Sequence, residues 1–360
     1  MSFFRDEVQQ LPAYIAGKAS ANPDVIKVAS NEMPGPSLPK VVAALTQNLE
    51  NLGQYPDFSV KDLRKAIAQF HGVSETQVLP ANGSVTLIEK ILCAICGADS
   101  EVIIPWRSFE AYPIAVQMAG AATIKVPLNS KGAPDLGAML DAVTLQTKAI
   151  LICSPNNPTS AAVTQKSFVN FLRHVPQDVL VIADEAYFEF VQMEDQLNAI
   201  KLVSEFSNLV VLRTFSKAYS LAGLRLGYAV AQAEIISGLQ KISTPFGVSA
   251  LAQSAGVAAL DDIAEVERRV AEICRERESL VAALKLQGWC GPVPQGNFIW
   301  FPLGSHSQIF SKICEEHGIT VRAYGADGVR VTVATPEASL RLIRAYSQFR
   351  HEFPELVGGK

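Results

Sequence analysis

The sequence has few features of a protein that binds nucleic acid or crosses a membrane. Its 31 Lys and Arg residues are outnumbered by 35 Asp and Glu, the net charge is −4, and no basic run occurs. We therefore expect no nucleic-acid partner. No apolar run approaches the roughly 20 residues that a membrane-spanning helix needs. The start, MSFFRDEVQQLPAYIAGK, lacks the pattern of a secretory signal, so we expect a cytoplasmic protein that acts on a small molecule and has no membrane partner.

Cysteine and histidine are scarce and scattered. Six cysteines and five histidines occur, and none of them shows the spacing of metal ligands. Cys93 and Cys96 form a C-x-x-C, but they fall within an apolar-periodic segment, VTLIEKILCAICG, with no second cysteine pair or histidine nearby. We expect these thiols to be reduced and to pack in the core, and we expect no metal site.

The chain is too long for one ordinary hydrophobic core, since such cores stop growing at roughly 250–300 residues. From about Gln77 to Val230 short apolar runs alternate with amphipathic stretches. This alternation predicts an α/β fold with a mostly parallel sheet flanked by helices. The expected strands are 101–105, 122–128, 149–155, 179–185, 209–215 and 226–230, and the expected helices are 84–96, 109–119, 165–174 and 234–242.

The pattern changes after Pro245. A long charged helix, short strands and two further helices predict a smaller α+β domain. We expect a large domain over residues 41–244 and a small domain over residues 245–360. Residues 1–40, rich in Pro, Gly and Asn, could pack on either, and we assign them to the small domain.

The segment LVVLRTFSKAYSLAGLRLGY combines a strand end with reactive side chains. The strand delivers Thr214, Ser216 and Lys217 to its C-terminal edge, where open α/β sheets bind ligands, and Arg225 follows a glycine-containing turn. These groups suit a phosphate with an amine beside it. Burial and cationic neighbours would lower the pKa of such a lysine and make it a nucleophile toward carbonyls. A solvated loop lysine is the alternative.

Three other strand ends carry complementary groups. Asp184 follows five apolar residues, and a carboxylate buried there needs a cation, such as a protonated pyridine nitrogen; a helix N-cap is the commoner explanation. Asn157 lies in an Asn-Asn-Pro turn, and its amide can face the same crevice. The amides of Gly83, Ser84 and Val85 open a helix and can cradle a phosphate. Each turn alone would be ordinary.

The order and the amino-acid sequences of these segments resemble those of the fold-type I pyridoxal-phosphate aminotransferases, in the branch of the histidinol-phosphate and aromatic amino acid aminotransferases. The resemblance covers nearly the whole chain. It is carried by LPAYIAGK, KVASNEMPGPS, NLGQYPD, SPNNPT, ADEAYFEF, RTFSKAYSLAGLRLGYAV and GVRVTVATPE.

The resemblance implies pyridoxal 5'-phosphate as the cofactor. Lys217 corresponds to the lysine that holds it as a Schiff base, and Asp184 to the partner of its ring nitrogen. The other implied cofactor contacts are Asn157 and Tyr187 for the ring oxygen, Thr214, Ser216, Arg225, Gly83, Ser84 and Val85 for the phosphate, and Phe109 for stacking on the ring.

The resemblance also implies substrate and subunit contacts. Tyr55 corresponds to a tyrosine that reaches the cofactor phosphate of the partner subunit, which implies a homodimer with shared sites. Arg330 corresponds to the arginine that binds the substrate carboxylate, for which a planar fork suits better than lysine. Tyr14 and Asn31 would lie near the substrate side chain, although an N-terminal strap with a structural role is the alternative. Arg322 would serve a substrate phosphate.

Several positions depart from the family pattern. Val85 and Thr86 replace an acidic pair, Ser160 replaces the glycine after the Asn-Asn-Pro-Thr turn, and Ala334 replaces the glycine after Val-Thr-Val. None of these changes removes a catalytic group. With WRSF and VRAYGADGVRVTV, they make the chain most similar to the actinobacterial type of aromatic amino acid aminotransferase.

The implied function is a ping-pong transamination between an aromatic amino acid (Phe, Tyr or Trp) and 2-oxoglutarate. Lys217, once freed by the substrate, would move a proton between the substrate α-carbon and the cofactor C4′. The main alternative is a histidinol-phosphate aminotransferase of histidine biosynthesis. A decarboxylase on the same scaffold is a third interpretation, and a cofactor-binding regulator a fourth, although no DNA-binding segment is present.

Overall fold

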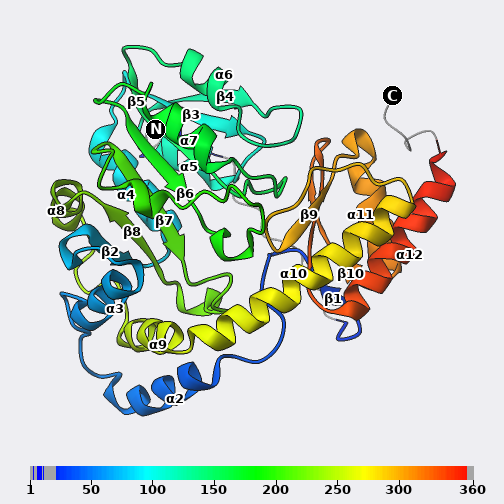
Figure 1. The fold of residues 1–360 in the computed structure, drawn as a ribbon, viewed down its shortest axis with the longest axis horizontal. Helices are drawn as coiled ribbons and strands as arrows, with labels where there is room; N and C mark the ends of the chain where they lie inside the picture. The colour runs from blue at the N-terminus through cyan, green and yellow to red at the C-terminus, as the bar shows by residue number, and fades with distance from the viewer. Residues whose placement is uncertain (1–2, 4–5, 10, 12–21, 355–360) are drawn as a thin grey trace.

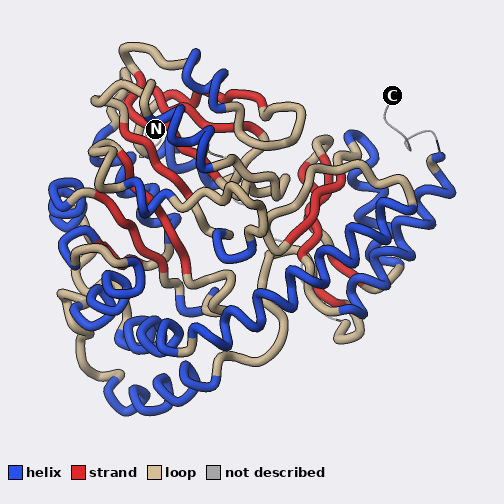
Figure 2. The backbone as a smooth tube through the Cα atoms, viewed as in Figure 1, coloured by secondary structure: helices blue, strands red, loops and turns tan. Residues whose placement is uncertain are grey.

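A computed structural model of the chain describes residues 3, 6–9, 11 and 22–354. Figure 1 shows a larger lobe and a smaller one, with the C-terminal third of the chain forming most of the smaller lobe. Figure 2 shows the strands gathered into two groups, one in each lobe. The α/β class expected from the sequence is therefore confirmed.

The larger lobe is built on a seven-stranded sheet with the order β2-β8-β7-β6-β5-β3-β4. Strands β4, β3, β5, β6 and β7 run parallel, whereas β8 is antiparallel to both β7 and β2. Six of these strands match those expected from the sequence, and β2 is an additional strand. The bounds are β2 Val78–Ala81, β3 Glu101–Trp106, β4 Ala122–Pro127, β5 Thr147–Cys153, β6 Leu180–Asp184, β7 Leu209–Thr214 and β8 Gly227–Ala231.

Both faces of this sheet are buried, as the near-continuous apolar strands predicted. Along β7 the side chains alternate between two hydrophobic clusters: Val211 belongs to one, and Val210 and Leu212 belong to the other. Helices cover the two faces, and four of them match the expected ranges. The helices of this part of the chain are α4 Ser84–Ile95, α5 Ala111–Met118, α6 Leu136–Asp141, α7 Gln165–Leu172 and α8 Ala233–Lys241.

The smaller lobe contains a three-stranded antiparallel sheet with the order β11-β12-β9. A second, two-stranded parallel sheet joins β1 to β10, so residues near the start of the described chain lie on this lobe. The bounds are β1 Ile26–Lys27, β9 Phe298–Phe301, β10 Ile319–Thr320, β11 Arg322–Tyr324, β12 Gly328–Thr332, α11 Ser307–Glu316 and α12 Pro336–Glu352.

One long helix connects the two lobes. Helix α10 (Ile263–Leu286) extends from the larger lobe to the smaller one (Figure 1). Helix α9 (Ala250–Asp261) packs on α2 (Pro39–Asn48) and α3 (Lys61–His71). The domain boundaries at residues 40 and 244 stay predictions. The remaining short elements are α1 Asp6–Gln9, η1 Leu49–Asn51, η2 Glu75–Gln77, η3 Phe188–Phe190, η4 Ala199–Leu202, η5 Ala222–Leu224 and η6 Gly304–His306.

Several helices begin where a hydroxyl side chain caps the first free amides. The side chains of Thr164, Ser249 and Thr335 accept hydrogen bonds from backbone N–H groups in the first turns of α7, α9 and α12. Such caps satisfy donors that have no partner within the helix. The local sequence therefore fixes these helix starts.

The expectation that Cys93 packs in the core is wrong. Cys93 is exposed and Cys96 half-buried, whereas Cys153, Cys274 and Cys314 are buried. Helix α4 buries a different stripe, formed by Leu87, Ile88, Ile91 and Leu92. Across the described residues, no helix is both long and apolar enough to cross a bilayer. Within the same residues, no group of three or more His, Cys, Asp or Glu side chains is arranged to hold a metal ion.

Candidate active site

A pocket lies at the carboxyl ends of the central strands, where the topology of a parallel sheet places ligand sites. The last residues of β5, β6 and β7, which are Cys153, Asp184 and Thr214, all line it. The smaller lobe closes the other side of the pocket with residues of β11 and β12. The predicted site residues that line it are Ser84, Val85, Phe109, Asn157, Asp184, Tyr187, Thr214, Ser216, Lys217, Arg225, Arg322 and Arg330.

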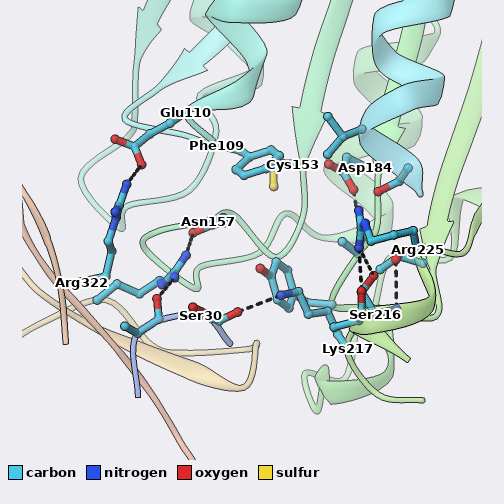
Figure 3. A pocket seen from close by; sticks show the side chains of 18 of the residues that line it. Ser30, Phe109, Glu110, Cys153, Asn157, Asp184, Ser216, Lys217, Arg225 and Arg322 are labelled. Atoms are coloured by element: carbon cyan, nitrogen blue, oxygen red, sulfur yellow. Dashed lines mark hydrogen bonds and ion pairs between the residues drawn. The ribbon is translucent and has the colours of Figure 1, made fainter. Parts of the chain in front are cut away.

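Lys217 follows β7 and points its amine into the middle of the pocket (Figure 3). Its Nζ donates a hydrogen bond to the Ser30 carbonyl oxygen at 3.0 Å. The pKa of this amine is lowered from 10.5 to about 7, mainly by burial and also by the guanidinium groups of Arg330 and Arg225, while Glu32 opposes the change. A large fraction of the amine is therefore neutral and nucleophilic near neutral pH.

Asp184 is buried at the end of β6. Its Oδ2 accepts a hydrogen bond from the Tyr112 hydroxyl at 2.6 Å, and its Oδ1 accepts one from the Ala186 backbone N–H at 3.2 Å. Burial raises the pKa of this carboxyl from 3.8 to about 6, although both hydrogen bonds oppose the rise. No ion pair found among residues 22–354 includes Asp184, so a cationic ligand group in the pocket would meet an unneutralised carboxylate.

One end of the pocket suits an anion. Helix α4 begins at Ser84, directly after Gly83, and its first amides face this region together with Arg225 and Ser216. Arg225 Nη1 donates to Ser216 Oγ at 3.4 Å and to the Ala222 carbonyl oxygen at 2.9 Å. Gly83 has φ +90°, and a Cβ there would lie 2.8 Å from Arg225 Nη2. Glycine therefore lets the arginine approach the helix start, although Gly83 itself does not line the pocket.

Arg330 reaches the pocket from β12 in the smaller lobe. Its Nη1 donates to Asn157 Oδ1 and its Nη2 to the Ala29 carbonyl oxygen, both at 2.6 Å. Arg330 Nε is buried and has no hydrogen-bond partner within the described part of the chain. A buried donor without a partner is costly, so this geometry favours an additional acceptor such as a ligand carboxylate.

Asn31 does not line the pocket but supports a residue that does. Its Nδ2 donates to the Tyr187 hydroxyl oxygen at 3.0 Å, while its Oδ1 accepts from Thr332 Oγ1 at 3.0 Å. Burial raises the pKa of the Tyr187 phenol well above its usual value. Tyr187 therefore stays protonated and keeps a hydroxyl donor for the pocket.

Phe109 lines the pocket and packs edge to face with Tyr112, with 5.5 Å between the ring centroids. Tyr55 lies elsewhere on the surface: its side chain is 83% exposed and stacks on Phe246 at 4.6 Å. The structure therefore does not bring Tyr55 to the pocket of its own chain. Tyr14 lies outside the described residues.

Arg322 lies at the opposite end of the pocket from Arg225 (Figure 3). Its Nη2 donates to Glu110 Oε2 at 2.7 Å, an ion pair that joins β11 to the start of α5. Sequence reasoning named Arg322 but missed Glu110.

Several other residues at the site were missed. Tyr112, which donates to Asp184, is the second residue of α5 and lies three positions after Phe109, which precedes the helix. Ser30 acts through its backbone oxygen, which no side-chain pattern reveals. Tyr324 lines the pocket and lies two positions after Arg322 on β11, within a segment noted only for its similarity.

Comparison with known proteins agrees with this arrangement. The sequence matches the family described as "Aminotransferase class I and II" over residues 23–345. It is 42% identical over 350 residues to a protein of Streptomyces avermitilis named aromatic amino acid aminotransferase, covering 97% of this chain and 98% of that protein. A protein of Rhodococcus jostii with the same name is 43% identical over 332 residues, covering 92% of each chain.

A solved structure with a similar fold is the histidinol-phosphate aminotransferase from Sinorhizobium meliloti, in complex with pyridoxal-5'-phosphate. It superposes with a TM-score of 0.87 and 24% sequence identity, covering 98% of both chains. At this identity the likeness concerns the fold alone.

Proposed function

This chain belongs to the class I and II aminotransferases, and we propose that it transfers the amino group between an aromatic amino acid (Phe, Tyr or Trp) and 2-oxoglutarate. The observation that carries the proposal is the pairing, in one pocket, of the Lys217 amine with a buried Asp184 carboxyl. The choice of aromatic substrates is supported by relatives that are 40–43% identical and carry that name.

We propose pyridoxal 5'-phosphate as the cofactor, because the pocket residues fit its aldehyde, its ring nitrogen, its ring oxygen and its phosphate. Lys217 would bond its aldehyde carbon, and Asp184 would face its ring nitrogen. The fit is supported by the raised pKa of Asp184 and by its lack of an ion-pair partner among the described residues. Arg225 and Ser216, with the first amides of α4, would hold the phosphate.

When bound, this cofactor supplies an electron-withdrawing ring that makes the α-proton of an amino acid acidic. Asp184, as a carboxylate, would keep a proton on the ring nitrogen. Tyr187 and Asn157 would donate hydrogen bonds to the ring oxygen. Lys217, with a pKa of about 7, would take the proton from the substrate α-carbon and deliver it to the C4′ carbon of the cofactor.

Arg330 would bind the α-carboxylate of both substrates. Its guanidinium plane is fixed by Asn157 and by the Ala29 carbonyl oxygen, and its Nε is the donor that has no partner within the described residues. Since one arginine serves both substrates, the first product must leave before the second substrate binds. This is the physical reason for proposing ping-pong order.

The subunit organisation is part of the proposal. Tyr55 is exposed and does not line the pocket of its own chain, as expected for a residue that reaches the site of a partner subunit. A homodimer with Tyr55 at the partner's cofactor phosphate would explain that exposure. We also propose a cytoplasmic location, which the six free cysteines support.

The test is a panel of amino donors assayed with purified holoenzyme and 2-oxoglutarate. Phe, Tyr or Trp should give the highest kcat/KM, and the corresponding 2-oxo acid should form. Lys217→Ala should lower kcat/KM by at least about a thousandfold, because the group that moves the proton is lost. A strong preference for histidinol phosphate, or release of carbon dioxide, would contradict the proposal. So would a colourless protein after incubation with pyridoxal 5'-phosphate.

A further inference from the structure

The ion pair between Glu110 and Arg322 has no part in the proposed chemistry, yet both residues line the pocket. Figure 3 shows the pair at one end and Ser216 with Arg225 at the other, with Lys217 between them. A substrate held by its α-carboxylate near Arg330 would extend its side chain toward the Glu110 end. In that orientation the pair would lie beside the substrate side chain.

The Glu110–Arg322 ion pair is short and partly buried. Arg322 Nη2 and Glu110 Oε2 are 2.7 Å apart, and the Arg322 side chain is only 10% exposed. The Arg322 guanidinium carbon also lies 5.5 Å from the centre of the Tyr324 ring. With its charge balanced by Glu110 and an aromatic ring beside it, this end of the pocket is nearly neutral and partly aromatic.

A substrate with an anionic side chain faces a specific cost here. Its anion would compete with Glu110 for Arg322 and would lie beside a second negative charge. An uncharged aromatic side chain leaves the pair intact. Like charges brought together in a partly buried site disfavour binding, and such repulsion is a recognised source of specificity.

We propose that Glu110 determines substrate specificity by neutralising Arg322, so that the pocket selects uncharged aromatic side chains over anionic ones. This inference rests on the proposed aminotransferase function and names a determinant of its substrate class. It also implies that 2-oxoglutarate, the anionic acceptor, binds only by displacing Glu110 from Arg322.

The alternative is that the pair has only a structural role and stabilises the contact between the two lobes, since Glu110 precedes α5 and Arg322 lies on β11. The chain supplies a matched control for that alternative. Arg107 forms an ion pair with Asp327 in the turn between β11 and β12, and its Nη1 also pairs with Glu110 Oε1 at 4.0 Å. This second pair joins the same two segments, but neither of its residues lines the pocket.

The test compares Glu110→Gln with Asp327→Asn in the holoenzyme. Glu110→Gln should raise kcat/KM for glutamate and histidinol phosphate by about tenfold relative to phenylalanine, mainly through KM. For the same reason, Glu110→Gln should also lower the KM for 2-oxoglutarate. Asp327→Asn should leave these ratios unchanged, and adding Arg322→Gln to Glu110→Gln should abolish the gain.

A binding measurement separates this inference from the proposed function. Glutarate, an unreactive dicarboxylate, should bind Glu110→Gln about tenfold more tightly than the wild type in calorimetric titration. If Glu110→Gln alters the folding of the protein, Glu110→Ala should show the same direction of change. Unchanged glutarate affinity and substrate ratios, or an equal change in Asp327→Asn, would overturn the role of Glu110. Failure of the wild type to transaminate any of phenylalanine, tyrosine and tryptophan would instead overturn the proposed function.

Discussion

Two adjacent acids at the end of β6 lie in contrasting environments. Asp184 faces the pocket and is bonded to neutral donors, the Tyr112 hydroxyl and the Ala186 backbone N–H. Glu185 faces away from it and accepts from Arg213 at 2.8 and 2.9 Å and from the Ala199 backbone N–H at 3.0 Å. Neighbouring residues of an extended chain point to opposite faces, which explains how one strand end supplies both.

The comparison shows that burial and a perturbed pKa do not by themselves identify an active site. On the Glu185 side, burial raises the pKa of Glu189 to about 7, and burial with Arg213 lowers that of His71 to about 3. These groups surround an arginine that is already paired. Asp184 differs because no cation in the described chain neutralises it. A buried acid that still requires a partner indicates a ligand site, whereas one that has its partner is structural.

Among the residues that face the pocket, Lys217 has the largest expected effect, a shift in the pKa of its amine. In cofactor-free protein its amine should titrate near pH 7, about three pH units below the pKa of an ordinary lysine. The pH dependence of its acylation, followed by mass spectrometry with the exposed lysines as internal reference, measures this value. Arg330→Gln should raise the midpoint because a nearby positive charge is removed. A midpoint near 10 in the wild type would show that the pocket does not activate this amine.

Arg213→Ala tests the paired side. It leaves Glu185 buried without its cation, so we expect the free energy of unfolding to fall by about 3–5 kcal/mol. Urea unfolding monitored by circular dichroism measures the loss. Replacing both partners together, with Arg213→Met and Glu185→Met, should recover most of the stability. A loss below about 1 kcal/mol for Arg213→Ala would mean that this pair is not structural.

Asp184→Asn tests the acid without a cation. Activity should fall by about a hundredfold, a typical cost of removing a preorganised electrostatic partner. The stability of the cofactor-free protein should not fall with it. The folded pKa of about 6 exceeds the unfolded value near 3.8, so wild-type stability should decrease as pH rises from about 4 to about 6. The variant should lack that component, and matching pH profiles for the two proteins would refute the assignment.

Arg173→Ala should give the smallest change in stability, and it serves as the reference for the buried pair. Arg173 and Glu205 form an ion pair at 3.8 Å, with side chains 64% and 54% exposed. Solvent screens such pairs, so stability should change by no more than about 0.5 kcal/mol and activity should not change. A loss comparable to that of Arg213→Ala would erase the distinction between the buried and exposed pairs.

The sequence by itself determined the strands and the residues at their ends. Apolar runs that stop at Asp184 and just before Thr214 identify buried strands, and a polar side chain at such an end must face a ligand edge or a partner. Local chemistry also fixed the helix starts at Thr164 and Thr335. The expectation for Cys93 was wrong because its helix is apolar on most sides. The sequence therefore does not show which side packs against the rest of the protein.

Only the tertiary structure decided which of these residues meet. Tyr112 reaches Asp184 across 72 positions, Ser30 reaches Lys217 across 187, and Glu110 reaches Arg322 across 212. No local propensity encodes such pairs: the first depends on how α5 packs on the larger sheet, and the other two depend on how the two lobes meet. The sequence thus supplied the chemical groups at the strand ends, while long-range packing determined which acid keeps a cation within the protein and which remains available to a ligand.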